Sequence, residues 1–184
     1  MQVIDWQLII NRHGPAVWRI AYRLLGNHAD AADCFQETFV SALEFCRRQH
    51  VWNFSALLAQ LATARAIDQL RRRVRRSSLT QSASVGAVSD RDKTAPVDWA
   101  AVPSANPDPA QQAQQQELAA RLRESLTQLP PREAQAFCLR YLNNMSYRQI
   151  AKALGIKTNA AGVLLHRARA KLRDSFRSSA TEQK

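Results

Sequence analysis

Apolar residues recur through the first part of the chain at the three- and four-residue spacing of helices that bury one face. Three polar or glycine-containing segments interrupt the pattern: Gly14-Pro15, Gly26-Asn27 and residues 47–53. Asn27 is a suitable N-cap for the helix after the second break, and Asp30 follows it at the capping-box distance. The pattern predicts four helices, near residues 2–12, 15–25, 28–46 and 54–76.

The composition changes between residues 77 and 107 to Ser, Ala, Thr, Asp and Pro, without a sustained helical or strand period. Such a composition is typical of a flexible linker. Trp99 is its only large aromatic residue, and either local packing or contact with a partner could account for it. A second helical unit is predicted from residue 108 to 177, with a tail at 178–184.

The stretch SYRQIAKALGIKTNAAGVLLHRARAKLR, residues 146–173, contains two helical patterns separated at Gly155. Ser146 and Gln149 have the spacing of a capping box, so the first helix is predicted to begin there. Gly155 can adopt the positive φ of a helix C-terminus, and Thr158 or Asn159 is expected to cap the second helix. Two short helices joined by such a turn predict a helix-turn-helix.

The second of these helices would turn its apolar residues to the core and its polar and basic residues outward. In a helix-turn-helix, the N-terminal residues of the second helix face base edges in the major groove, and neighbouring basic groups contact phosphates. Asn159 and Arg167 are candidates for base contacts, Gly162 permits close approach, and Arg148, Lys157 and Arg169 suit phosphates. The predicted DNA surface comprises Arg148, Lys157, Thr158, Asn159, Gly162, Val163, His166, Arg167 and Arg169.

Charge supports nucleic acid as the partner. The chain has 26 Lys and Arg against 15 Asp and Glu, a net charge of +11. Residues 71–76 and 166–173 concentrate arginines without any acid, whereas a solubilising surface normally mixes both signs. One or two cations suffice to complement a helix dipole, so the six arginines from Arg65 to Arg76 predict a phosphate-binding track.

Asp30, Asp33 and Glu37 share one helical face and form an acidic island in this basic chain. A catalytic or metal-binding carboxylate pair is one reading, but no histidine or glycine-rich loop accompanies it. An exposed solvated face is the second reading. A docking face for a basic partner is the third, and the charge contrast favours it.

The three cysteines and four histidines show no metal-ligand spacing, so we expect no metal, no cofactor and no enzymatic activity. Cys34, Cys46 and Cys138 are interpreted as small buried side chains in a reducing compartment. Neither an export signal nor an apolar run of about 18 residues is evident, which predicts a cytoplasmic protein without membrane insertion.

The chain resembles the extracytoplasmic-function (ECF) type of RNA polymerase sigma factor, a compact group of the sigma-70 family that keeps sigma domains 2 and 4. The resemblance rests on three segments in order: YRLLGNHADAADCFQETFVSALEF, LATARAIDQLRRRVRR and LTQLPPREAQAFCLRYLNNMSYRQIAKALGIKTNAAGVLLHRARAKLR. It implies an all-α fold of a four-helix sigma domain 2 at 1–76 and a helix-turn-helix sigma domain 4 at 108–177, joined by the flexible linker 77–107.

The resemblance also implies partners and site residues. It implies that Asp30, Asp33, Gln36 and Glu37 bind the β′ clamp helices of core RNA polymerase, with further contacts to the β subunit. It implies that the melted −10 promoter element meets the loop 47–53 and the arginine helix. Trp52 could stack on an unpaired base, although we expect it to anchor the core. The −10 residues implied are Arg47, Arg48, Trp52, Arg65, Gln69, Arg72, Arg73, Arg75 and Arg76.

The helix-turn-helix would then read the −35 element. Residues 160–164, AAGVL, depart from the more cationic pattern that is frequent in this family. The function implied is an alternative sigma factor that directs promoter recognition and transcription initiation, controlled by an anti-sigma factor. The alternative is a stand-alone helix-turn-helix DNA-binding regulator, which would leave the acidic face and the arginine helix unexplained.

Overall fold

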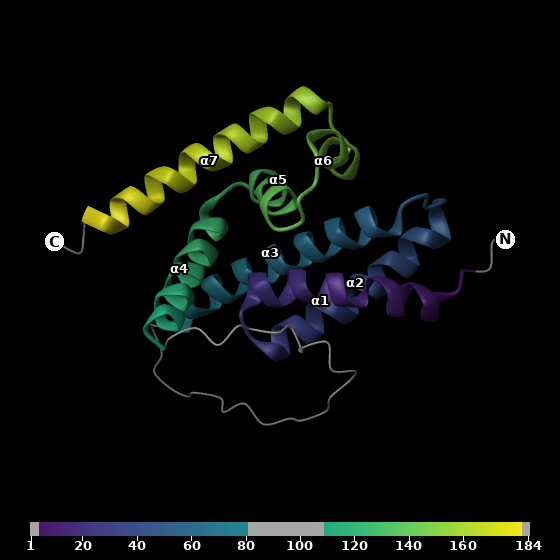
Figure 1. Cartoon of the computed structure of the whole chain (residues 1–184), viewed down its shortest axis with the longest axis horizontal. Coiled ribbons are helices and arrows are strands. Elements are labelled where there is room, and N and C mark those ends of the chain that lie inside the picture. The colour runs from purple at the N-terminus through teal and green to yellow at the C-terminus, as the bar shows by residue number, and fades with distance from the viewer. Residues whose placement is uncertain (1–3, 81–108, 182–184) are drawn as a thin grey trace.

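The computed structural model describes residues 4–80 and 109–181, including the side chains of 4–76 and 114–177. Most of the predicted linker, with Trp99, and the last residues of the tail lie outside the described residues. Every regular element in the described ranges is a helix, which confirms the all-α class (Figure 1). The seven helices are α1 (Trp6–Leu25), α2 (His28–Arg48), α3 (Phe54–Thr80), α4 (Pro109–Gln128), α5 (Pro131–Tyr141), α6 (Tyr147–Leu154) and α7 (Thr158–Thr181).

The helix break predicted at Gly14-Pro15 is wrong, because α1 continues through both residues. Proline removes one backbone donor and its ring crowds the preceding turn, at a cost of about 3 kcal/mol. The helical apolar spacing continues without a phase change from Trp6 and Ile10 to Val17 and Leu24, and these residues pack into or against the core. Burial on both sides of the proline therefore maintains one helix where local rules predict two.

Asn27 caps α2 as predicted. Its side-chain oxygen accepts a hydrogen bond from the backbone N–H of Asp30 at 2.8 Å. The Asn27 side-chain amide in turn donates to the Asp30 carboxylate at 2.7 Å, so the second bond of this cap comes from the side chain instead of the backbone. Within α2, the buried Thr38 hydroxyl donates to the carbonyl of Cys34 at 2.7 Å.

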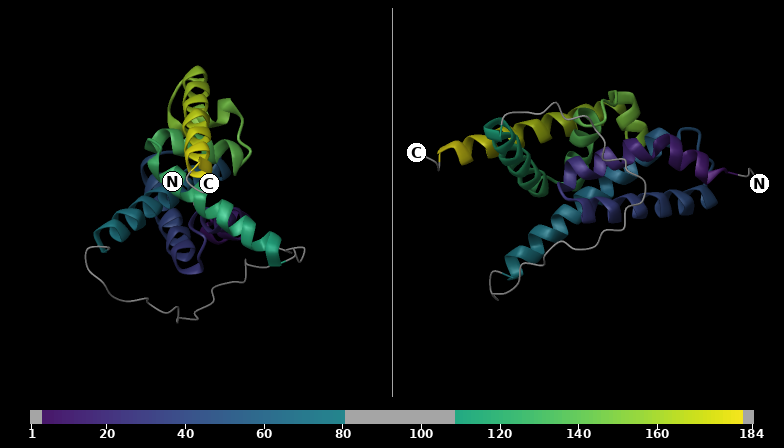
Figure 2. Two further views of the ribbon diagram at one scale, coloured as in Figure 1. Left: turned by 90° about the vertical axis from the view of Figure 1, so that its left-hand side faces the viewer. Right: turned by 60° about the horizontal axis from the view of Figure 1, so that its bottom comes forward.

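Helix α3 lies at the centre of the molecule (Figures 1 and 2). It contacts α1 and α2 on one side and α4, α5 and α6 on the other. Ala62 and Ala66 are fully buried along it, and their small side chains allow the neighbouring helices to approach closely. The helix continues to Thr80, beyond the end predicted at residue 76.

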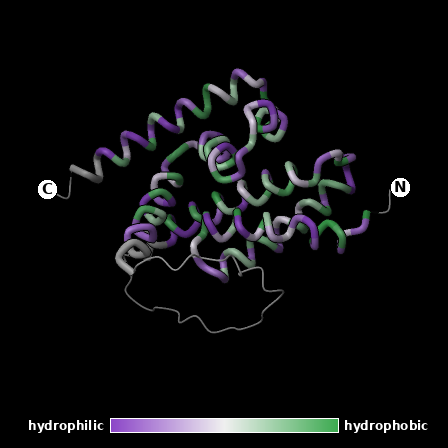
Figure 3. Tube along the Cα trace, viewed as in Figure 1, coloured by the Kyte–Doolittle hydropathy of each residue, from purple (hydrophilic) through white to green (hydrophobic). Residues whose placement is uncertain are grey.

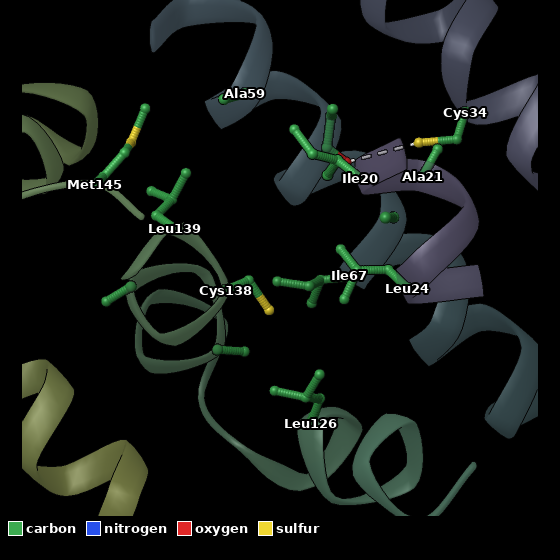
Figure 4. Close-up of a cluster of buried hydrophobic side chains, with 14 of the residues drawn as sticks. Ile20, Ala21, Leu24, Cys34, Ala59, Ile67, Leu126, Cys138, Leu139 and Met145 are labelled. Atoms are coloured by element: carbon green, nitrogen blue, oxygen red, sulfur yellow. Dashed lines mark hydrogen bonds between the residues drawn. The ribbon is translucent and has the colours of Figure 1, made fainter. Parts of the chain in front are cut away.

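An apolar contact joins the two units that the sequence predicts separately; we call it the seam. Figure 4 shows Leu126 and Cys138 on one side of it and Leu24 and Ile67 on the other, and all four are buried. They belong to one continuous hydrophobic cluster that draws on all seven described helices. Because each fully buried leucine or isoleucine contributes about 1.5–3 kcal/mol, the seam is a substantial part of the fold.

Arginines add directional bonds across the seam. Arg123 of α4 donates from Nε to the carbonyl of Leu24 at 3.0 Å and from Nη2 to that of Arg23 at 3.3 Å. Arg71 of α3, in the first unit, donates to the carbonyl of Leu129, which follows α4 in the second unit. A cation near a helix C-terminus also interacts favourably with the helix dipole. Each unit thus binds the end of a helix in the other.

Gly26 combines two requirements at the end of α1. Its φ of 77° is left-handed, and a Cβ built there would lie 2.7 Å from Cζ of Arg123. Gly155 has a similar φ of 64° but no neighbouring atom within 4 Å of a built Cβ. A comparison of alanine substitutions at Gly26 and Gly155 therefore separates the cost of backbone strain from the cost of the contact with Arg123.

We expect Gly26→Ala to lower the free energy of unfolding by about 1–2 kcal/mol from the left-handed backbone, plus the cost of displacing Arg123. In an Arg123→Ala background, only the backbone cost should remain. Urea unfolding followed by circular dichroism measures both, with Gly155→Ala as the control whose cost is the same in either background. Equal costs of Gly26→Ala in both backgrounds would contradict the steric role of Arg123.

The cysteines give a second test of the fold. Burial raises the pKa of the Cys34 and Cys138 thiols to about 12, whereas the half-buried Cys46 has a smaller rise from the same cause. Because the thiolate is the reactive form, iodoacetamide at pH 8 should modify Cys46 first. Mass spectrometry should find the other two modified only after denaturation, and early modification of Cys138 would indicate that the seam opens.

Candidate nucleic-acid interface

The helix-turn-helix forms with the predicted capping box. The N–H of Gln149 donates to the Ser146 hydroxyl at 3.3 Å, and the N–H of Ser146 donates to the Gln149 side-chain oxygen at 2.8 Å. Gly155 ends α6 in the left-handed conformation, as predicted. The predicted cap of the second helix is wrong: α7 already begins at Thr158, and the carbonyl of Lys157 accepts from Ala161 at 3.1 Å. The turn is therefore shorter than the sequence suggested.

One face of α7 is buried against α5 and α6, and Figure 3 shows hydrophilic and hydrophobic residues mixed along this helix. Ala161, Leu165, Ala168 and Leu172 supply the buried face, as their spacing predicted. On α5, the nearly buried Glu133 forms an ion pair of 3.0 Å with Lys171. This packing turns the other face of α7 outward.

The residues predicted to contact DNA lie on the outward face of α7, in the turn before it (Lys157) and on α6 (Arg148). Gly162 is partly covered, and the others are exposed: Arg148, Lys157, Thr158, Asn159, Val163, His166, Arg167 and Arg169. Seven residues line a shallow hollow with a mostly apolar surface, which we call the α7 hollow: Tyr147, Thr158, Asn159, Gly162, Val163, His166 and Arg167.

Tyr147, the first residue of α6, is the member of the α7 hollow that sequence reasoning missed. Its ring lies 5.5 Å from the guanidinium carbon of Arg140, a cation–π contact that holds the aromatic side chain in place. An aromatic residue next to the capping serine of a helix-turn-helix was the available signal. The fixed, partly exposed ring extends the candidate interface from α7 onto α6.

A second hollow, the loop hollow, lies between the beginning of α1, the end of α2 and the loop after it. Arg47, Arg48 and Trp52 line it together with apolar residues. Trp52 is 85% exposed, so the expected core-anchor role is wrong. Phe54 fills that place instead: it packs against the core and meets Trp6 edge-on with ring centroids 6.2 Å apart. Trp52 meets only the His50 ring among the aromatic contacts described, at 4.6 Å.

The arginine residues predicted on α3 fall into two environments. Arg65 is half-buried and donates to the Ser41 hydroxyl at 2.9 Å, which ties it to α2. The side-chain oxygen of Gln69 is buried without a hydrogen-bond partner among the described atoms. The remaining predicted members, Arg72, Arg73, Arg75 and Arg76, are exposed.

The acidic face of α2 lies next to these arginines. Asp30 and Asp33 line one groove with Gln69 and three of the exposed arginines, whereas Asp33, Gln36 and Glu37 line a second groove with Arg65. Asp30 is the least free of the acidic residues, because its carboxylate holds the Asn27 amide and lies 3.8 Å from Arg73. Asp33, Gln36 and Glu37 are exposed, so a partner can reach two carboxylates and the amide between them on this face.

The described residues show neither a metal-binding cluster nor a membrane-spanning helix. Within residues 4–80 and 109–181, no three His, Cys, Asp or Glu side chains are arranged to hold a metal ion. None of the helices in these ranges is long and apolar enough to cross a membrane.

The fold and the surfaces define an all-helical protein of two parts, the second of them a helix-turn-helix with a basic outer face. Comparison with protein families agrees with this division: residues 9–76 match Sigma-70 region 2, and residues 119–172 match Sigma-70, region 4. The chain belongs to the sigma-70 family, and its curated relatives are sigma factors of the extracytoplasmic-function type.

Curated relatives and a solved structure are similar over nearly the whole chain. The ECF RNA polymerase sigma factor SigE of Mycolicibacterium smegmatis is 31% identical over 97% of this chain, which spans 64% of that relative's length. SigW of Bacillus subtilis, an ECF RNA polymerase sigma factor, is 25% identical over 92% of this chain and 87% of its own length. The structure of the sigma factor RpoE with the anti-sigma factor NepR from Bartonella quintana has a TM-score of 0.54 at 18% identity, covering 94% and 97% of the two chains.

Proposed function

We propose that this protein is an alternative sigma factor that binds core RNA polymerase and directs promoter recognition and transcription initiation. It acts in the cytoplasm and performs no chemistry of its own. The observation that carries the proposal is that one chain presents an exposed acidic face on α2 and a helix-turn-helix with a basic outer face, in the order of sigma regions 2 and 4. A DNA-binding regulator needs only the second of these.

Residues 1–76 would bind polymerase through Asp33, Gln36 and Glu37, with Asp30 at the edge of the contact. The exposure of these side chains supports this assignment, and so does the partly exposed Val40 beside them. Complementary charge speeds encounter and selects the partner, while an adjacent apolar side chain adds buried area. The β′ clamp helices are the expected partner, with the β subunit contacted elsewhere.

The loop hollow and α3 would hold the melted −10 element. Single-stranded bases bind where an aromatic surface lies beside cations, and the exposed Trp52 next to Arg47 and Arg48 offers that combination. Arg72, Arg73, Arg75 and Arg76 are suited to the phosphates that lead to this hollow. The linker 77–107 would let residues 108–177 reach the −35 element.

An anti-sigma factor is the proposed regulator. The solved RpoE structure was determined with such a partner, NepR. For this chain, the proposal rests on membership of the same group, and an anti-sigma factor would act by covering the α2 face or the helix-turn-helix.

Transcription by purified core polymerase on genomic promoter fragments tests the proposed function. Start sites that appear only when this protein is added, and that share two upstream elements, are the expected result. Absence of both new start sites and binding to core polymerase, with specific binding to duplex DNA retained, would instead establish a stand-alone regulator.

Reversal of charge on the α2 face should weaken polymerase binding. We expect Asp33→Lys with Glu37→Lys to reduce core affinity at least about tenfold, because like charges facing each other at an interface cost several kcal/mol. Glu117→Lys with Glu124→Lys on α4 makes the same change in net charge at two exposed acids away from this face. Fluorescence anisotropy with labelled protein measures the affinity, and equal losses in both pairs would reject a specific docking face.

Arg167 and Arg169 of α7 should contribute to promoter binding in different ways. Arg167→Ala should cost about 1–3 kcal/mol on promoters with the preferred base at one upstream position and little on others. Arg169→Ala should weaken all promoters alike and reduce the slope of log affinity against log salt by about 0.9. Holoenzyme binding to a promoter series at several salt concentrations measures both, and a uniform loss for Arg167→Ala would assign it to phosphate.

A further inference from the structure

Gly162 has no structural reason inside the protein to be glycine. It lies within α7, its φ is not left-handed, and a Cβ built there meets no atom within 4 Å. Glycine in a helix interior is less stable than alanine because it loses more backbone freedom on folding. The fold alone would favour a side chain here, so the absence of one points to something that approaches from outside.

Gly162 is one of the residues that line the α7 hollow, and its missing side chain leaves space there. The apolar lining of the hollow includes the Tyr147 ring and the Val163 side chain, which is 49% exposed. Polar residues, among them Asn159 and Arg167, also line it. A small apolar group flanked by hydrogen-bonding groups would match this arrangement, whereas a phosphate or a polar base edge would leave the apolar lining unused.

The major groove of DNA contains one such group, the 5-methyl of thymine, which lies beside the O4 acceptor and next to neighbouring base edges. The hollow lies at the N-terminal part of the second helix, the part of a helix-turn-helix that faces base edges. Exposed Arg148 on α6 and exposed Lys157 in the turn provide positive charge for contacts with the DNA backbone.

We propose that the α7 hollow binds the methyl group of one thymine in the upstream promoter element, with Val163 and Tyr147 contacting the methyl and Gly162 making room for it. This inference rests on the proposed function and specifies one base that the helix-turn-helix reads. The polar residues that line the hollow then contact the neighbouring bases. Contact with the methyl group fixes the position of α7 along the groove, and this position determines which bases the polar residues meet.

Replacing thymine by deoxyuridine tests the proposal, because uracil keeps the O4 acceptor and lacks only the methyl group. Holoenzyme made with the full chain is bound to a promoter fragment identified by transcription, with each upstream thymine replaced in turn. We expect one position at which affinity falls about fourfold, the factor for one methyl group withdrawn from an apolar contact. Other positions should change little.

Protein variants locate the contact. In Val163→Ala holoenzyme, the difference between thymine and deoxyuridine at that position should become clearly smaller, because Val163 provides one of the two contacts to the methyl group. Leu118→Ala is the matched control, because Leu118 is an exposed apolar residue of α4, away from the hollow, and should leave the difference intact. Gly162→Ala should raise the free energy of unfolding of the chain and lower promoter affinity, two changes in opposite directions that a purely structural role would not produce.

The outcomes separate this inference from the function on which it rests. If changes in the upstream element alter binding but no thymine is sensitive to deoxyuridine, or if the element contains no thymine, the methyl proposal is wrong and the sigma assignment stands. The proposal is also wrong if a thymine is sensitive to deoxyuridine and Val163→Ala leaves the size of that effect unchanged. If no upstream sequence affects binding or start sites, the proposed function fails and the inference fails with it.

Discussion

The contact between α3 and the helices of the second unit is the interaction on which the rest of the structure depends. Each unit by itself is small, and small domains bury only a limited fraction of their surface. Because Ile67 of α3 and Leu24 of α1 share one apolar cluster with Leu126 and Cys138, both units gain buried area that neither has alone. Apolar contact is not directional, so it cannot fix the relative orientation of the units by itself. The bonds of Arg123 and Arg71 to helix ends supply that direction, since each guanidinium meets carbonyls at one place only.

The same contact determines which surfaces remain available. Helix α5 contacts both α3 and α7, and neither the outer face of α7 nor the four arginines near the end of α3 (Arg72, Arg73, Arg75 and Arg76) are covered by these contacts. Both candidate nucleic-acid surfaces are therefore exposed while the two units are packed together. Burial disfavours the charge of Arg123 and lowers its pKa, and the nearby charge of Arg73 lowers it further. Such a buried cation is retained because the carbonyls of α1 accept its hydrogen bonds.

Local features of this fold could be predicted from sequence and features of long range could not. The caps at Asn27 and Ser146 and the turn at Gly155 depend on residues a few positions apart, and the structure contains them. Pro15 misled because the stop signal is local, whereas the burial that overrides it comes from other helices. Trp52 misled because size alone favours burial, whereas Phe54, which begins the apolar stripe of α3, makes the contact with Trp6. The seam was missed because a helical stripe shows which face is buried and not what covers it.

The arrangement of charge on α2 and α3 has a consequence for how two partners could bind one basic chain. A net charge of +11 attracts any polyanion over a distance, but at physiological salt the field of one charge extends only about 8 Å. Within that distance, Asp33 and Glu37 reverse the sign of the surface, so DNA is repelled there and a basic surface is attracted. The pair Arg73–Asp30, at 3.8 Å and exposed, stabilises the free protein little. Breaking the pair therefore costs little free energy, so Arg73 can bind a phosphate and Asp30 can bind a basic partner instead. The two adjoining surfaces of opposite sign can in this way bind different ligands.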